Sequence, residues 1–207
     1  PVVLVDYPHP RLPAVHTDDV AGGRMATEHL LELGHERIAF IGDFEHNYHG
    51  FTSSAMRRVG YQEALSAAGL EVEPELVRRA SHGREAAAAL TRELLELDDP
   101  PTAIFAASDT QAIGVLSGAD ELGVGVPDDL AVVGYDDIEI ARYAGLTTIA
   151  QPLEESGAIG AHLLLAALDG ECGSGRQLPV RLVVRSTTSG VTDRRREARM
   201  DAKRVRS

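Results

Sequence analysis

The stretch Pro101-Thr-Ala-Ile-Phe-Ala-Ala-Ser-Asp109 decides the fold of this chain. Ala103 to Ala107 is an apolar run without alternating polar residues, which is typical of a strand buried on both faces of a parallel sheet. Ser108 and Asp109 follow it, and both residue types favour the N-terminal cap of a helix. Apolar residues then recur at helical spacing until Gly123, where the helix is expected to end. The stretch therefore predicts a buried strand followed by a helix.

A second buried strand is expected at Leu130 to Val133, just before Asp136 and Asp137. In an open parallel sheet, the carboxyl ends of the strands form the ligand crevice. Because Ser108 and Asp109 follow the first strand, these four polar residues are expected to line one mouth. They are the first candidates for a binding site.

The rest of the chain continues the alternation of strands and helices. About seven strands and five helices are expected, which suits two lobes better than one small sheet. The strands outside the opening stretch are expected at residues 2–5, 38–41, 77–80, 146–150 and 182–185. Residues 6–17 are interpreted as a Pro-rich loop and residues 170–175 as a turn.

A polar loop at residues 42–54 interrupts this rhythm. Its aromatic residues, Phe44, Tyr48 and Phe51, are of the type that stacks on ligand rings. His46 and His49 raise the question of a metal site. With no third ligand at a suitable spacing, two solvated loop histidines are the favoured interpretation.

Arg57 and Arg58 are expected to open the helix after this loop. A long arginine near a helix start can reach into a crevice and make a bidentate contact. It can equally well lie on the surface, and spacing alone does not decide between the two.

Composition excludes several classes of protein. The 207 residues contain no run of eighteen apolar residues and no basic segment leading into an apolar one at the start, so we expect a protein that is not exported and is cytoplasmic. The single cysteine, Cys172, rules out an internal disulfide and fits a reducing compartment. There is no phosphate loop, nucleophile elbow or metal triad, so no enzyme, metal or cofactor is predicted.

Charge is unevenly distributed. The chain has 20 basic and 32 acidic residues, a net charge of -12, yet seven basic residues lie between Arg194 and Arg206. An acidic body repels nucleic acid, whereas the basic tail at residues 191–207 could be a nucleic-acid arm. A disordered, solvated C-terminus is the favoured interpretation of that tail.

Several motifs together resemble one family. These motifs are Asp18 to Gly23, Glu28 to Gly42, Arg57-Arg-Val-Gly-Tyr61, Pro101 to Gly114, Gly123 to Asp137, Leu146-Thr-Thr-Ile-Ala-Gln-Pro152 and Leu182-Val-Val-Arg-Ser-Thr187. With them, the chain from residue 1 to about 190 resembles the effector-binding region of bacterial repressors of the lactose and purine repressor (LacI/GalR) family.

The resemblance implies an α/β fold of two doubly wound parallel-sheet lobes of periplasmic-binding-protein type I. The chain is expected to pass between the lobes three times, with the effector bound between them. Residues 1–43 and 147–172 are assigned to an N-terminal lobe, and residues 44–146 and 173–190 to a C-terminal lobe.

Family members also carry an N-terminal helix-turn-helix, a hinge helix and a first strand-helix-strand-helix segment, which are absent here. The N-terminal lobe is therefore expected to be incomplete, with Val2 to Val5 unpaired and an apolar face uncovered, so that the chain is a fragment. A partner chain that covers the gap is the alternative.

The resemblance also implies a set of effector-binding residues. Arg57, three residues before Gly60, occupies the place of an arginine that grips the effector, and Asp136 that of an acidic contact to hydroxyl groups. Ser108 stands where family members often have Asn, which weakens that contact. Gln151 lies at a crossover, and Tyr48 or Phe51 could supply the stacking aromatic.

The function implied is effector sensing in a DNA-binding transcriptional repressor. An arginine and an aspartate across a polar cleft suit a sugar or related polyol, and a purine is the less favoured effector. Lobe closure would change operator binding by the missing helix-turn-helix in a homodimer, which is allostery. The alternatives are a stand-alone solute-binding receptor for a sugar and, less favoured, an enzyme on a flavodoxin-like sheet.

Overall fold

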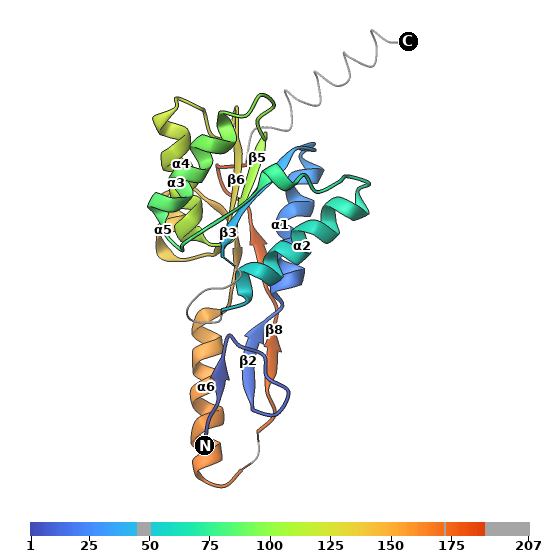
Figure 1. Ribbon diagram of the computed structural model, residues 1–207. Helices are drawn as coiled ribbons and strands as arrows, with labels where there is room; N and C mark the ends of the chain where they lie inside the picture. Colours follow the sequence, from blue (N-terminus) through green and yellow to red (C-terminus); the bar gives the residue numbers. More distant parts are fainter. Residues whose placement is uncertain (45–50, 172, 189–207) are drawn as a thin grey trace. The chain divides into compact units, whose positions relative to one another are not determined.

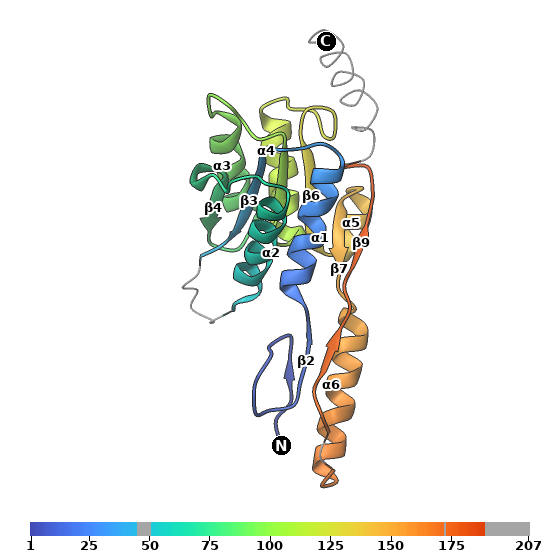
Figure 2. The ribbon, with the colours of Figure 1, turned by 90° about the vertical axis from the view of Figure 1, so that its right-hand side faces the viewer.

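The computed structural model describes residues 1–44, 51–171 and 173–188, and its course is drawn in Figures 1 and 2. The chain forms two compact units. Unit 1 consists of Pro1–Asp18 and Gln151–Arg181, and unit 2 of Asp19–Ala150 and Leu182–Ser207. The chain passes from one unit to the other three times, as the resemblance implies. Several residues singled out above lie outside the described ranges: His46, Tyr48, His49, Cys172 and the basic tail.

Unit 2 is built on a six-stranded sheet in the order β4-β3-β5-β6-β7-β9. The pairings from β4 through β7 are all parallel, as predicted. The strands are β3 (Ile38–Asp43), β4 (Val77–Ala80), β5 (Ala103–Ala106), β6 (Ala131–Asp136), β7 (Thr147–Ala150) and β9 (Arg181–Val183).

Helices cover both faces of this sheet. Figure 1 shows α1 and α2 together on one face and α3 and α4 together on the other. The helices of unit 2 are α1 (Asp19–Glu32), α2 (Ser53–Ala67), α3 (Arg84–Leu95), α4 (Asp109–Glu121) and the short α5 (Glu139–Tyr143), with a 3-10 turn at Pro74–Leu76 before β4. This double cover explains why apolar residues fill the central strands without alternation.

The opening stretch behaves as predicted. All four residues of β5 are buried. Ser108 caps α4, because its side-chain oxygen accepts a hydrogen bond from the backbone N–H of Gln111 at 3.2 Å. Helix α2 differs from the prediction, since it begins at Ser53 and places Arg57 in its second turn. The loop after β3 is therefore shorter than expected.

The core of unit 2 has an aromatic part on β3, β5 and α2. The ring of Phe40 lies 5.5 Å from the ring of Tyr61 and 5.5 Å from that of Phe105, measured between centroids. The hydroxyl of Tyr61 donates to the backbone oxygen of Ile38 at 2.8 Å, so the ring is buried without leaving its polar atom unpaired. Aliphatic side chains of the sheet, α3 and α4 form a further cluster in this core.

Helices α1 and α2 touch through glycines. A Cβ atom added at Gly60 would lie 2.0 Å from the backbone oxygen of Val20, and one added at Gly23 would lie 2.0 Å from the backbone oxygen of Arg57. Real side chains do not approach backbone atoms so closely. The two helices can therefore keep this separation only with glycine at both positions.

The substitution Gly60→Ala is expected to lower the free energy of unfolding by about 3 kcal/mol, because it forces α1 and α2 apart. Gly157→Ala is the matched control: Gly157 lies inside a helix of unit 1 with open space around it, and alanine there is expected to stabilise by about 0.5–1 kcal/mol. Urea unfolding followed by circular dichroism measures both. Equal midpoints for the two variants would show that the close contact is not needed.

Unit 1 contains a three-stranded parallel sheet in the order β1-β2-β8. Its strands are β1 (Leu4–Val5), β2 (Ala14–Thr17) and β8 (Arg176–Leu178), and helix α6 (Leu153–Leu168) packs on β1 and β2. The predictions of a loop at residues 6–17 and of an unpaired first strand are wrong in part, because β2 lies in that range and pairs with β1. The last turn of α6 leaves Leu165 and Leu168 exposed.

The boundaries between the units differ from those predicted for the lobes. Residues 19–43 and 147–150 belong to unit 2, because β3 pairs with β4 and β5 and β7 pairs with β6. Residues 173–181 belong to unit 1, where β8 pairs with β2. An apolar run predicts a strand but does not say which sheet the strand joins.

Within the ranges that the structure describes, every helix is too short or too polar to cross a membrane.

Candidate functional site

The carboxyl end of the unit 2 sheet has a topological switch point between β3 and β5. The connection after β3 leads through α2 to β4 on one side, whereas the connection after β5 leads through α4 to β6 on the other. Ligands of open α/β sheets bind where the connections diverge in this way. Asp43 at the end of β3, Ser108 after β5 and Asp136 at the end of β6 mark this edge.

Arg57 is the central charged side chain at this edge, although only 5% of the residue is exposed. Its Nε donates to Asp19 at 2.8 Å, and its Nη1 donates to the backbone oxygen of Ala107 at 2.7 Å and to Asp136 at 3.4 Å. The guanidinium carbon lies 3.6 Å from the centroid of the Tyr135 ring, a cation–π contact. Arg57 thus connects α1 and α2 with the residue that follows β5 and with the end of β6.

The charge of Arg57 is secured by its neighbours. Burial alone lowers the pKa of a guanidinium, but the carboxylates of Asp19 and Asp136 outweigh burial and raise the pKa of Arg57 above its usual value. Arginine provides a rigid fork of donors, so its partners are held in fixed directions. The carboxylate of Asp136 is consequently oriented by a cation that stays charged.

Asp136 and Asp137 form a strained turn at the end of β6. Their φ angles are 116° and 57°, in the left-handed region that residues other than glycine rarely adopt. The Asp136 side chain is 22% exposed beside Arg57. The Asp137 carboxylate instead accepts a hydrogen bond from Arg185 at 2.6 Å. Strained residues cluster at binding sites, and Asp136 is the one of the two whose carboxylate faces Arg57.

Ser108 is brought to the same edge but is occupied. Only 5% of it is exposed, and its hydroxyl is bonded to the backbone and side chain of Gln111. Gln111 in turn donates to Asp43 at 3.0 Å, and His82 lies 3.2 Å from the same carboxylate oxygen. Gln111, Asp43 and His82 were not predicted as site residues. Asp43 ends a buried strand as Asp136 does, and that pattern could have identified it.

The other three residues predicted to contact the ligand are Phe51, Gln151 and Tyr48. Phe51 is 64% exposed, just before α2. Gln151 belongs to unit 1, where its side-chain oxygen accepts a hydrogen bond from the hydroxyl of Thr17 at 2.9 Å. Tyr48 is outside the described ranges. The structure therefore places Arg57, Asp136 and Ser108 at the same edge of the sheet, and ligand contacts by all six residues stay predictions.

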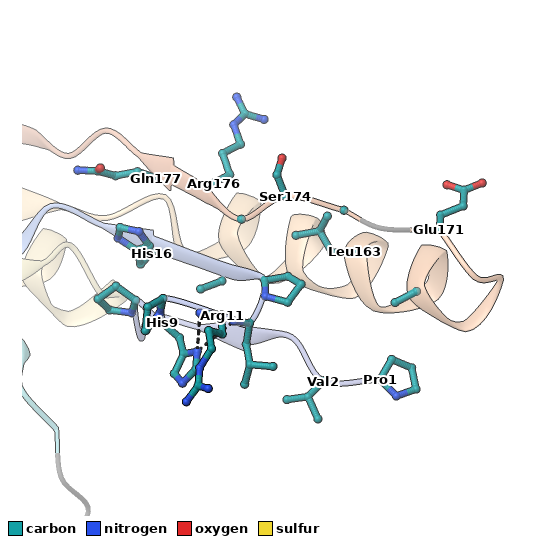
Figure 3. Close-up of a pocket in the computed structure, with 18 of the residues that line it drawn as sticks. Pro1, Val2, His9, Arg11, His16, Leu163, Glu171, Ser174, Arg176 and Gln177 are labelled. Carbon is teal, nitrogen blue, oxygen red and sulfur yellow. Dashed lines mark hydrogen bonds between the residues drawn. The ribbon is translucent and has the colours of Figure 1, made fainter.

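Unit 1 has a hollow of its own, of about 1030 Å³, between β2, β8 and the C-terminal half of α6. His9 lies at the wall of this hollow (Figure 3). Its Nδ1 accepts hydrogen bonds from the backbone N–H groups of Arg11 and Leu12, so this atom is bonded within the loop that carries it. Prolines and glycines form much of the remaining wall. Convergent charged groups like those around Arg57 are not found among its described lining residues. Among the residues that the structure describes, no group of three or more His, Cys, Asp or Glu side chains is arranged to hold a metal ion.

Comparison with known proteins identifies the family. A family model described as "Periplasmic binding protein-like domain" matches residues 27–188. The chain belongs to this family. As a member of the periplasmic binding protein-like domain family, it has the fold that the sequence predicted, and the resemblance to LacI-family regulators is confirmed by the relatives that follow.

The relatives of this periplasmic binding protein-like domain are transcription regulators. The HTH-type transcriptional repressor CytR of Escherichia coli (strain K12) is 37% identical over 194 residues, 91% of this chain and 56% of CytR. The transcriptional regulator CelR in its cellobiose complex is 35% identical with a TM-score of 0.82, covering 90% of this chain and 58% of that one. A LacI family regulator from Enterococcus faecium with bound ribose is 32% identical with a TM-score of 0.81, covering 91% and 70%. The chain thus spans little more than half the length of CytR.

Proposed function

We propose that this chain is the effector-sensing domain of a bacterial transcriptional repressor and that it binds a small sugar at the carboxyl end of the unit 2 sheet. The observation that carries the proposal is the pairing of Arg57 with the accessible carboxylate of Asp136 at the switch point. A carboxylate can accept two hydroxyl protons from neighbouring sugar carbons. The cellobiose and ribose complexes of the relatives favour a sugar over a purine.

In this proposal each site residue has a separate role. Asp136 accepts hydroxyl protons, while Arg57 fixes its carboxylate and supplies the balancing positive charge. Asp43 and Gln111 add polar groups at the neighbouring strand ends. Ser108 contributes mainly by capping α4, because its hydroxyl is already bonded. None of these groups forms a nucleophile–base pair of the kind that hydrolysis needs, so we propose binding without turnover.

The remainder of the proposal concerns the full-length repressor. Sugar binding shifts the populations of two arrangements of the units, and only one of them suits operator binding by a DNA-binding segment like that of the HTH-type relatives. We propose that the repressor acts as a homodimer in the cytoplasm, where its operator lies. Sedimentation with and without operator DNA tests the homodimer, and a monomer bound to the operator would exclude it.

Wild-type protein is expected to be stabilised by a sugar in a thermal-shift screen of mono- and disaccharides, sugar phosphates and nucleobases. At about 100 times the dissociation constant, the ligand adds about 2.7 kcal/mol to the free energy of unfolding. Asp136→Asn keeps the shape of the side chain but removes its charge, and we expect it to lose most of the shift. Asp128→Asn, an exposed aspartate outside the site, is the control and should respond like wild type. Equal shifts in all three proteins would place the binding site elsewhere.

A further inference from the structure

Asp109 is a buried acid that the proposed sugar contacts do not use. It is the first residue of α4, and none of its surface is exposed. One carboxylate oxygen accepts a hydrogen bond from the backbone N–H of Ile138 at 2.9 Å, and the other accepts one from the hydroxyl of Thr148 at 2.6 Å. A single side chain therefore joins α4, the turn after β6, and β7.

The turn that Asp109 holds is the one that carries Asp136. Asp136 and Asp137 adopt left-handed φ angles in succession, and Ile138 directly follows them. Such a conformation costs free energy and persists only when surrounding contacts enforce it. The bond from Asp109 to the N–H of Ile138 fixes the end of this turn, whereas Arg185 fixes the carboxylate of Asp137.

The neighbouring strand leaves room for this arrangement. A Cβ atom added at Gly134 would lie 2.4 Å from a carboxylate oxygen of Asp109, so any larger residue there would displace the acid. Burial of the Asp109 carboxylate also costs free energy. Burial and the nearby Asp136 and Asp137 raise the pKa of Asp109 to about 6, although its bonds to Thr148 and Ile138 lower it. An acid that only complemented the positive N-terminal end of α4 could face water, where it would not bear this cost.

We propose that Asp109 is a positioning residue for the sugar site, which holds the Asp136–Asp137 turn so that the Asp136 carboxylate faces Arg57 and the ligand. The inference about affinity rests on the proposed function, whereas the inference about the turn does not. Asp109→Ala removes both acceptors. Asp109→Asn keeps one oxygen for Ile138 and offers an amide N–H to Thr148, so it should rescue the turn.

The test measures two properties of wild type, Asp109→Ala and Asp109→Asn. Hydrogen exchange at the amide of Ile138, followed by NMR without ligand, is expected to be at least tenfold faster in Asp109→Ala and within threefold of wild type in Asp109→Asn. The dissociation constant for the sugar found in the screen, measured by titration calorimetry, is expected to rise at least tenfold in Asp109→Ala and less than threefold in Asp109→Asn. Thr148→Val keeps the side-chain shape, removes one of the two bonds, and should give about threefold faster exchange even if Asp109→Ala does not fold.

The outcomes separate the two inferences. Unchanged exchange in Asp109→Ala, or in Thr148→Val if the alanine variant does not fold, would overturn the role of Asp109 in the turn. Faster exchange with wild-type sugar affinity would show that Asp109 stabilises the turn without positioning the site. If wild-type protein bound no sugar, the proposed function would fail, and exchange at Ile138 would still decide whether Asp109 holds the turn.

Discussion

Arg57→Ala is expected to lower the free energy of unfolding by about 3–5 kcal/mol, the range for removing one partner of a buried ion pair. The substitution leaves the Asp19 carboxylate without the guanidinium that neutralises it, and the side chain of Asp19 is only 14% exposed. It also removes the donor to the backbone oxygen of Ala107 and the cation on the Tyr135 ring. Urea unfolding at pH 7.5 measures the change.

The control for this prediction is another arginine of unit 2. Arg24 pairs with Glu63 at 2.6 Å, but the two side chains are 45% and 49% exposed. Exposed pairs contribute roughly 0–1 kcal/mol, so Arg24→Ala should change little. Arg57→Lys should fall between the two, because lysine keeps the charge but cannot reproduce the fixed fork of contacts. If Arg57→Ala unfolded at the same urea concentration as Arg24→Ala, the central role given to Arg57 would be wrong.

The stability of the protein is expected to depend on pH through Asp109. Its pKa is raised from 3.8 to about 6 in the folded protein, so the folded state holds a proton more tightly than the unfolded chain. Between these values, unfolding releases that proton, and the contribution of Asp109 to the free energy of unfolding falls as pH rises from about 4 to about 6. The rise from 3.8 to about 6 corresponds to about 3 kcal/mol of stability that is present at pH 4 and lost above pH 6.

Asp109→Asn removes this titration and isolates its effect. The carboxylates facing Asp109 are those of Asp136 and Asp137, which pair with Arg57 and Arg185, and these groups are the same in both proteins. Relative to wild type, Asp109→Asn should therefore gain up to about 3 kcal/mol between pH 4 and pH 7.5. Urea unfolding at intervals of one pH unit measures the difference. A difference that stays constant with pH would show that Asp109 titrates normally.

The parts of the fold that sequence predicted are those with strong local signals. The run from Ala103 to Ala106 is uniformly apolar because helices cover both faces of its strand, and Ser108 is a cap because a hydroxyl can satisfy a free N–H. Strands β2 and β8 were missed. Ala14–Thr17 and Arg176–Leu178 are short and mixed in polarity, and their pairing joins segments about 160 residues apart, which no local pattern reports.

The candidate site shows the same limit. Motifs placed Arg57 and Asp136 together, and the structure agrees. The sequence did not show that Asp19 would share Arg57, since that contact spans 38 residues and depends on how α1 packs against α2. It also identified Asp109 as a polar residue of the mouth, although the acid is completely buried. Burial is set by neighbours from other segments, and composition around a residue does not reveal it.

The division of unit 1 into two distant segments affects how the protein is made. Strand β2 leaves the ribosome about 160 residues before its partner β8, which ends at Leu178. Domains of bacterial proteins begin to fold while synthesis continues at roughly 5–20 residues per second. The strands from β3 to β7 and their helices can assemble as they emerge, whereas the sheet of unit 1 must wait until β8 has been synthesised after them. Until then the apolar residues of β1, β2 and α6 are partly exposed to solvent. This is therefore the stage of synthesis at which a chaperone would find the most apolar surface to bind.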